Sequence, residues 1–361
     1  SFWSYLHRRQ SHRLIELLVT AFVMILALLS KEMAITLPAT FVAYELLLNA
    51  ARRQPGSSMD LGLVRWLKVS IAPTLVFWLV LAVYFVVRRW ALGTFVGGYD
   101  DSLFFISNWQ AFLPGWLHGL QMLVIPLNRD FLSMHSMITR SWEVSIALIG
   151  GIVLIKAATS RTTFQLALFY TMWFMLCLAP VYKRFNIADD LQGSRLAFMA
   201  TVPLCMFLSL AFVRNREAKL AVPNRLLQSF QAVLAVAVLA LATYLLMLNN
   251  QAWREAGHES NAIRAALHNV YSTIKGDPQV LFLGLPDNRH GAYICRNALD
   301  GMLQKPQFVK DIKHSIMLDR YEPTFPFGFL KKSIVNSRNE LLAFRWERSA
   351  LRFIPLNLFR I

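Results

Sequence analysis

Long apolar runs separated by short polar segments dominate the chain up to about residue 249. A membrane-spanning helix needs about 20 mostly apolar residues, and several runs approach that length. These runs are Leu14 to Leu29, Ala34 to Ala50, Val69 to Val87, Val144 to Ala158, Phe164 to Val181, Leu196 to Val213 and Ser229 to Leu248. The pattern predicts a mostly α-helical, polytopic membrane domain of about seven spans.

A further stretch, Trp109 to Leu127, has the length of a span but a different composition. Prolines and polar residues interrupt it: Pro114, His118, Gln121 and Pro126. Irregular backbone at membrane depth is tolerated only where protein or a water-filled cavity surrounds it, so we expect a re-entrant or interfacial helix. Gly115 and Gly119 stand four residues apart within it, a spacing typical of close helix contact.

Charged residues become frequent after Leu248. Residues 1–249 are therefore the expected membrane domain, and residues 250–361 a small soluble domain of the α/β or α+β class. Helical spacing runs from Gln251 to Ile274. Continuous apolar runs predict three strands: Gln279 to Leu285, Ser315 to Leu318 and Leu341 to Phe344. After the first strand, the turn-forming segment PDNRHG leads into a helix expected from Ala292 to Leu303.

The composition indicates lipid as the main solvent. Apolar residues make up 56% of the chain and charged residues only 16%, whereas a soluble domain carries about 25% charged residues. Three cysteines are too few for a disulfide framework or a cysteine-based metal site. The net charge of +16 resides in basic residues that flank the apolar runs, so anionic lipid headgroups explain it and no nucleic-acid partner is expected.

The distribution of lysine and arginine sets the expected orientation, because cationic loops are retained on the cytoplasmic side. With seven spans, the less basic loops are those around Lys31, from Arg88 to Trp142 and from Lys183 to Arg195, and everything after Asn249 falls on the same side. If Trp109 to Leu127 also crosses, the contrast shrinks and the later loops change sides. The first arrangement predicts a multi-pass protein of a bacterial inner membrane with an extracytoplasmic C-terminal domain.

Ionisable residues at membrane depth are the first candidates for chemistry, because charge is costly there. Lys31 and Glu32 stand between the first two apolar runs. In an ordinary polar hairpin, Ser30 caps the next helix and Glu32 favours its N-terminus through the helix dipole. In a functional site, Lys31 holds a phosphate and Glu32 orients a sugar hydroxyl or a cation. Both interpretations stay open.

A second cluster lies in the segment KRFNIADDLQGSRLAFMATVP, just ahead of a span. Arg195 either snorkels to the headgroups or grips a lipid-linked phosphate with both arms of its guanidinium. Lys183 and Arg184 add positive charge to the same segment. Asp189 and Asp190 are either ligands for a divalent cation or solvated loop acids, the commoner case.

A third group begins with Asp100 and Asp101, which aromatic residues follow along the same loop. A carboxylate can accept a hydroxyl proton while an aromatic face stacks on a sugar ring, so both aspartates are catalytic candidates. Ordinary loop acids are the alternative. His118 and His135 have no partners at metal-ligand spacing, so no zinc site is expected.

Several segments resemble a known family. LLSKEMAITLPATFVAYELLL is similar to a segment of GT-C type integral membrane glycosyltransferases that use polyprenyl-phosphate-linked sugars. The closest likeness is to relatives of protein O-mannosyltransferases that are often fused to tetratricopeptide repeats. NWQAFLPGWLHGLQMLVIPLNRD, SWEVSIAL and GSRLAFMATVP resemble the later membrane part of that family in order and spacing. The resemblance covers roughly Leu14 to Val213.

The resemblance implies the C-terminal portion of an inverting hexosyltransferase. Such an enzyme moves a sugar from a lipid-phosphate donor to a protein or glycan acceptor at the extracytoplasmic face, with an acidic residue as base. Lys31 and Glu32 would face the active-site cavity, and Arg195 would approach the donor phosphate. The family's acidic catalytic motif lies upstream of this sequence. Ser194 and Phe198 also replace the glutamate and tyrosine that relatives carry around the arginine, and no tetratricopeptide pattern follows.

Two other classes of function remain open. One is a non-catalytic scaffold in cell-surface polysaccharide assembly. The other is a transporter or flippase subunit for lipid-linked sugars, although transporters usually show paired repeats that this sequence lacks. The transferase hypothesis requires that Lys31 and Arg195 lie at one outward-facing hollow.

Overall fold

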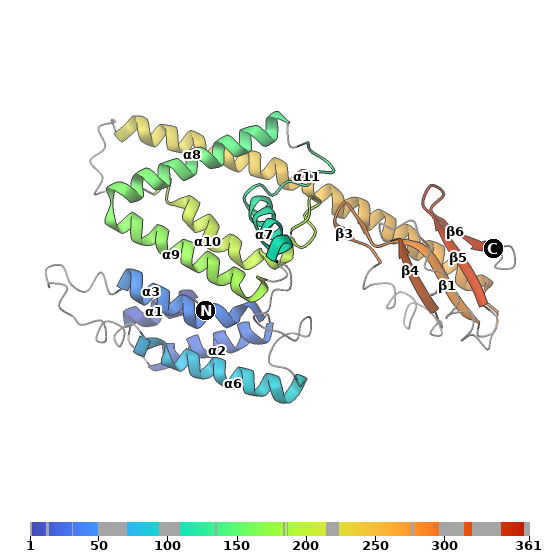
Figure 1. The fold of residues 1–361 in the computed structure, drawn as a ribbon, viewed down its shortest axis with the longest axis horizontal. Helices are drawn as coiled ribbons and strands as arrows, with labels where there is room; N and C mark the ends of the chain where they lie inside the picture. The colour runs from blue at the N-terminus through green and yellow to red at the C-terminus, as the bar shows by residue number, and fades with distance from the viewer. Residues whose placement is uncertain are drawn as a thin grey trace. The chain divides into compact units, whose positions relative to one another are not determined.

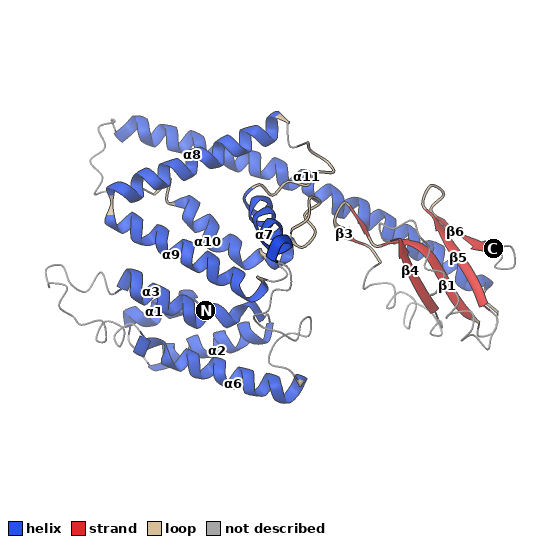
Figure 2. Ribbon diagram, in the orientation of Figure 1, coloured by secondary structure: helices blue, strands red, loops and turns tan. Residues whose placement is uncertain are grey.

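The computed structural model describes residues 2–11, 14–30, 32–49, 71–93, 109–133, 136–182, 185, 187–213, 224–275, 278–295, 314–319 and 341–356. The described chain is mostly helical and has a small sheet near its C-terminus (Figures 1 and 2). It divides into two compact units. The helical unit consists of Ser1–Pro126 and Met134–Leu241, and the sheet unit of Leu127–Ser133 and Ala242–Ile361.

Helices of very different length build the helical unit. The α-helices are α1 (Phe2–Ser11), α2 (Leu14–Ser30), α3 (Leu37–Tyr44), α6 (Leu75–Leu92), α7 (Trp109–Val124), α8 (Met137–Thr159), α9 (Arg161–Leu178), α10 (Phe198–Ser209) and the first part of α11 (Asn224–Thr273). Short 3-10 turns are η1 (Glu32–Thr36), η3 (Ala72–Thr74), η4 (Ala179–Val181) and η5 (Ser194–Leu196), and η2 (Glu45–Asn49) is a π-helical turn.

Within the described residues, four helices are long and apolar enough to cross a membrane: Ala72–Leu92, Met137–Thr159, Arg161–Val181 and Ser229–Thr273. Three other predicted runs form shorter apolar helices, so the count of seven spans is not confirmed: Leu14–Ser30, Met33–Leu48 and Phe198–Ser209. Irregular turns at their ends shorten the helices that two of these runs form. The second begins in η1 and ends in η2, and the third begins after η5 and ends at Ser209.

Local capping explains where several helices begin and end. Ser136 caps α8 by accepting a hydrogen bond from the Thr139 N–H at 3.1 Å. Ser160 ends α8 and at once caps α9, accepting from the Thr163 N–H at 3.4 Å. A serine oxygen in this position satisfies a backbone donor that a helix start leaves without an intrahelical partner. One residue is therefore enough to join α8 to α9.

An aromatic core joins the first helices of the unit. The ring of Tyr5 in α1 stacks on Phe41 of α3 with 4.3 Å between centroids, and Phe77 of α6 meets Phe41 edge-on at 4.9 Å. All three side chains are fully buried. The Tyr5 hydroxyl donates to Glu45 Oε1 at 2.5 Å, which gives this buried carboxylate a partner. Helix α1 thus packs into the helical unit through Tyr5.

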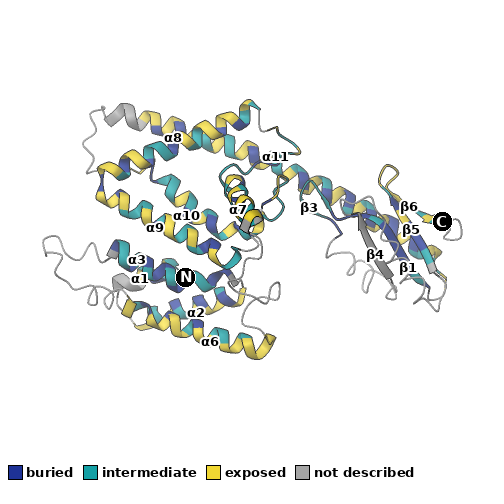
Figure 3. Cartoon of the chain, viewed as in Figure 1, coloured by how far each residue is buried: buried dark blue, intermediate teal, exposed yellow. Residues whose placement is uncertain are grey.

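The outer faces of the long helices are apolar. On α6, the exposed large side chains are Leu75, Val76, Trp78, Leu79, Val83, Val86, Val87, Trp90 and Leu92 (Figure 3). A contiguous apolar surface of this extent is not left in contact with water by a soluble monomer. The exposed faces therefore agree with the four membrane-length helices in indicating a membrane protein.

A buried lysine closes the C-terminal end of α10. Lys156 Nζ, from the last turn of α8, donates to the carbonyls of Leu210, Ala211 and Val213 at 3.2, 2.5 and 3.0 Å. The amide of Gln231 in α11 donates to the same Ala211 carbonyl at 2.8 Å. These bonds satisfy carbonyls that a helix end leaves without intrahelical partners, and they place positive charge at the negative end of the helix dipole.

The sheet unit contains a four-stranded mixed sheet and a two-stranded hairpin. The strands are β1 (Gln279–Pro286), β2 (Asn288–Arg289), β3 (Ala292–Tyr293), β4 (His314–Asp319), β5 (Leu341–Glu347) and β6 (Arg352–Leu356). The sheet order is β4-β1-β5-β6, in which β1 runs parallel to both neighbours and β6 antiparallel to β5. All three apolar runs predicted as strands lie in this sheet.

The second part of α11 packs on one face of the sheet. Its buried positions recur with helical spacing: Ala252, Ala256, Ile263, Ala266, Leu267 and Val270. They contact Val280, Phe282 and Leu285 of β1, whereas Leu281 and Leu283 point to the opposite face. The alternation changes step at Gly284, whose φ of +67° belongs to a bulge in the pairing of β1 with β4. An extra residue in one strand reverses the alternation beyond it, and this brings Leu285 to the face that α11 covers.

The helix predicted from Ala292 to Leu303 is wrong at its start. Ala292 and Tyr293 pair with Arg289 and Asn288 in an antiparallel hairpin. The remainder of that prediction, from residue 296 on, lies outside the described residues. The hairpin forms because two consecutive residues, His290 and Gly291, have positive φ values of +47° and +82°, which turn the chain back instead of starting a helix.

Candidate functional site

Segments that are distant in sequence gather at the C-terminal end of α9. Helix α9 continues into η4, and η1, which begins at Glu32, packs against η4. Residues at the end of α9 and the start of α10 share one buried cluster, including Leu178 and Ala200. The described residues between η4 and α10, among them Phe185 and Ile187, belong to the same cluster and so lie at this end of α9. The backbone of Glu32 and the loop that carries Arg195 lie at the same end of the helical unit.

Hydrogen bonds within the loop fix the approach to α10. The Ala188 N–H donates to the Gln192 carbonyl at 3.0 Å, and the Gln192 N–H donates to Asp190 Oδ1 at 2.9 Å. Gly193, with φ of +90°, then lets the chain enter η5. Arg195 follows in η5 with an exposed side chain, directly before the N-terminus of α10. A helix N-terminus favours anions, so this arginine and the helix end favour the same kind of ligand.

Helix α7 packs against the same loop. Trp116 meets the ring of Phe185 edge-on at 5.8 Å between centroids, and Gly119 lies so close that a Cβ there would come within 2.9 Å of Phe185 Cε1. His118 Nε2 lies 3.1 Å from Asp189 Oδ1. The loop thus contacts α7 both through an aromatic ring and through an ion pair when His118 is protonated. Of the two predicted contact glycines, Gly119 is in close contact, with a loop residue and not with another helix.

Most of the predicted site residues lie outside the described residues. This holds for Lys31, Asp100, Asp101, Lys183 and Arg184. For Glu32 the backbone is described at the start of η1, but the side chain is not. Arg195 is described and exposed, as required of a residue that meets a ligand. Among the residues that the structure describes, no group of three or more His, Cys, Asp or Glu side chains is placed to hold a metal ion.

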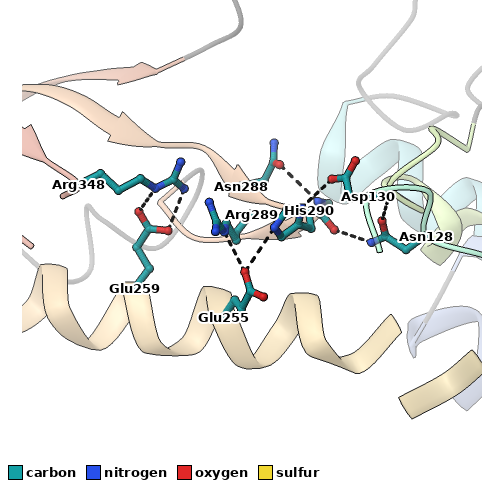
Figure 4. Close-up of polar contacts among 9 residues, drawn as sticks. Asn128, Asp130, Glu255, Glu259, Asn288, Arg289, His290 and Arg348 are labelled. Carbon is teal, nitrogen blue, oxygen red and sulfur yellow. Dashed lines mark hydrogen bonds and ion pairs between the residues drawn. The ribbon is translucent and has the colours of Figure 1, made fainter. Parts of the chain in front are cut away.

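A second polar cluster, which the sequence did not predict, lies in the sheet unit. It joins the loop Leu127–Ser133 to α11 and to the β2–β3 hairpin (Figure 4). His290 Nδ1 lies 2.8 Å from Asp130 Oδ2, and His290 Nε2 lies 3.3 Å from Glu255 Oε2. Arg289 Nε donates to the same Glu255 oxygen at 3.0 Å. The imidazole therefore lies between two carboxylates from distant parts of the chain.

Asparagines fix the loop in this cluster. The buried Asn128 donates through its side-chain amide to the His290 carbonyl at 2.9 Å, and its backbone N–H donates to Asn249 Oδ1 at 3.1 Å. Its side-chain oxygen accepts from the Asp130 N–H at 3.1 Å. The Phe131 ring packs against His290 with 4.7 Å between centroids. The loop is therefore held against His290 by a hydrogen bond from Asn128 and by the ring of Phe131.

One helical turn further along α11, Glu259 binds Arg348 in a two-pronged ion pair. Arg348 Nε and Nη2 donate to the two carboxylate oxygens at 2.7 and 2.9 Å. Glu259 is 8% exposed and therefore needs such a partner. Burial, together with the negative charges of Glu259 and Asp287, raises the pKa of the neighbouring Cys295 thiol to about 12. This thiol is not a nucleophile at neutral pH.

Comparisons of the chain with protein-family models, with curated proteins and with solved structures find no match. The functional inference therefore uses the geometry at the C-terminal end of α9 together with the resemblance seen in the sequence.

The sequence contained a partial signal for the second cluster. Glu259 falls in the buried stripe of α11, between Ala256 and Ile263, and a carboxylate at such a position predicts a cationic partner. The pairing of Asn128 with His290 carries no local signal, because 162 positions separate the two residues.

Proposed function

We propose that the chain binds a polyprenyl-phosphate-linked sugar at the C-terminal end of α9 and takes part in its transfer to an acceptor, as membrane glycosyltransferases of the GT-C type do. The proposed reaction takes place at the extracytoplasmic face. The observation that carries the proposal is the gathering of η1, η4 and the α9–α10 loop at one end of the helical unit. Two of the segments that carry the family resemblance thereby come to one place.

Arg195 is the proposed contact for the donor phosphate. Its guanidinium can donate two parallel hydrogen bonds to phosphate oxygens, and the start of α10 adds a favourable helix dipole. Lys31, Lys183 and Arg184 belong to the same two segments and supply further positive charge in the proposal. Glu32 and the pair Asp100 and Asp101 are the proposed carboxylates for orienting or deprotonating the acceptor hydroxyl.

The packing of α7 supports this role for the loop. A phosphate grip needs an arginine whose backbone is held in place, because the two hydrogen bonds require a fixed direction. The bonds within the loop and the contacts of Phe185 and Asp189 with α7 provide that support. A solvated loop without such contacts would serve only as a connection between two helices.

Photoaffinity labelling tests the proposal without knowledge of the acceptor. The full-length protein in lipid vesicles is exposed to a photoreactive polyprenyl phosphate, and the labelled fraction is measured for each variant. Arg195→Ala should lower labelling at least tenfold, because a charge-assisted two-pronged contact contributes roughly 1.5–3 kcal/mol. Arg195→Lys should fall between, since lysine keeps the charge and loses the fork.

Arg161→Ala is the matched control, because Arg161 is also an exposed arginine at the start of a helix but lies at the other end of α9. It should label like the unmodified protein. Equal labelling of Arg195→Ala and the unmodified protein would refute the phosphate contact. If labelling depends on Arg195 but no sugar is transferred to any protein or glycan acceptor, the lipid-binding step stands and the transferase assignment gives way to a transporter or scaffold.

A further inference from the structure

The position of His290 between two carboxylates has a consequence for the loop Leu127–Ser133. This loop connects α7 to α8 in the sequence, yet it packs as part of the sheet unit. Asp130 contributes one carboxylate from the loop and Glu255 contributes the other from α11. His290 is the only described side chain that an ion pair links to both.

Both ring nitrogens of His290 lie within reach of a carboxylate oxygen, at 2.8 and 3.3 Å. A neutral imidazole has one N–H and one lone pair, whereas an imidazolium has two N–H donors. With a neutral ring, one of the two contacts would set a lone pair against a carboxylate oxygen. The arrangement of two acceptors is thus matched to the protonated ring.

The charges around the ring agree with this. Asp130 faces Nδ1 from the loop, and Glu255 faces Nε2 from α11. Arg289, in the same hairpin, donates to Glu255 and offsets part of its charge. Arg289 engages Glu255 and leaves Asp130 to the histidine. A neutral His290 keeps a single N–H and no charge, so its contact with Asp130 would lose the attraction between opposite charges, whereas Glu255 would keep Arg289 as a cationic partner.

The geometry points to a proton-dependent latch, in which protonated His290 holds the loop Leu127–Ser133 against α11 and the β2–β3 hairpin, and its deprotonation loosens the loop. Histidine is the side chain whose charge ordinarily changes between about pH 5 and 8. The latch is therefore closed in mildly acidic solution and loosened in mildly alkaline solution.

Hydrogen exchange at two pH values tests the latch in the full chain. The reporters are the backbone amides of Asp130, Phe131 and Leu132, whose hydrogen bonds to Asn128 hold the loop in shape. After correction for the intrinsic effect of pH on exchange, these amides should exchange roughly fivefold faster at pH 8.5 than at pH 5.5. A change of that size matches one partly exposed ion pair.

His290→Asn is the decisive variant. Asparagine accepts positive φ and, followed by glycine, favours a two-residue hairpin turn, so the hairpin is kept while the titrating ring is removed. The variant should show no difference between the two pH values. Asp130→Asn should likewise show none, because it removes the loop's charge. His258→Asn, at an exposed histidine elsewhere on α11, should keep the full response.

Three results would each contradict the latch. A corrected exchange rate that is the same at both pH values in the unmodified protein would overturn the latch. The same pH response in His290→Asn as in the unmodified protein would also overturn it, as would loss of the response in His258→Asn alone. None of these measurements requires sugar transfer, so the result is independent of the proposed function.

Discussion

Replacement by alanine is expected to have opposite effects on stability at the two glycines of α7. Alanine at Gly119 would place a methyl group 2.9 Å from Cε1 and 3.3 Å from Cδ1 of Phe185, whereas carbon atoms in packed interiors lie about 3.5–4.0 Å apart. Alanine at Gly115 meets no atom within 4 Å. The contact between α7 and the α9–α10 loop is therefore sensitive to Gly119→Ala and insensitive to Gly115→Ala.

The magnitudes follow from two effects. Replacing glycine by alanine inside a helix stabilises it by about 1 kcal/mol, and this gain applies to both positions. Overpacking costs about 1–3 kcal/mol, and Phe185 has little room to move because it is 3% exposed and packs edge-on against Trp116. We expect Gly119→Ala to be destabilising by about 1 kcal/mol and Gly115→Ala to be stabilising by about 1 kcal/mol.

Hydrogen exchange of the loop amides measures this difference in the full chain. The Leu191, Ser194 and Ala197 amides donate to carbonyls within or next to the loop and report its opening. Gly119→Ala should speed their exchange and Gly115→Ala should leave it unchanged or slower, with a combined difference of about 2 kcal/mol in the free energy of opening. Equal effects of the two variants would refute the close contact between Gly119 and Phe185.

Three further predictions concern groups outside that contact. Arg348→Met should destabilise the sheet unit by about 2 kcal/mol and Glu259→Met by about 1 kcal/mol, because only the first variant leaves a buried charge unpaired. Hydrogen exchange of the β1 amides measures both effects. A larger effect of Glu259→Met than of Arg348→Met would contradict the pairing. Lys156→Met should destabilise the end of α10 by roughly 2 kcal/mol, since carbonyls lose their donor, and a thermal melt in detergent that matches the unmodified protein would disprove this. Because its pKa is raised to about 12, Cys295 should resist alkylation by iodoacetamide from pH 7 to 9 in the folded protein. The same thiol should react after denaturation. Alkylation of the folded protein that rises with pH over that range would contradict the burial of Cys295.

The regular elements were largely predictable from local patterns. Apolar runs of sufficient length became α6, α8, α9 and α11, because a helix in lipid needs only a continuous apolar sequence to satisfy its backbone. Runs bounded by irregular turns form shorter helices: α10 begins after η5 and ends at Ser209, although it continues through Pro203. The strand β1 was equally clear from its uninterrupted apolar residues.

The contacts that build both clusters were not predictable in the same way. His118 had no partner at metal-ligand spacing, and the residue that meets it, Asp189, comes from a distant loop. The helix expected at Ala292 failed because His290 and Gly291 adopt consecutive positive φ values, and histidine is an unusual first residue for such a turn. Pairing across the fold depends on the packing of whole elements, which short patterns do not encode.

The bulge at Gly284 determines to which face of the sheet the later side chains of β1 point. Because the extra residue moves Leu285 to the face covered by α11, Asp287 two positions later also points inward and is 6% exposed. Its carbonyl accepts from the Ile294 N–H at 3.0 Å, across the base of the β2–β3 hairpin. Deleting one residue here would turn that hairpin, with its histidine, toward the wrong side of the sheet. A shortened β1 would thus disturb the fold more than most substitutions within it, because the deletion shifts a whole hairpin out of register with α11.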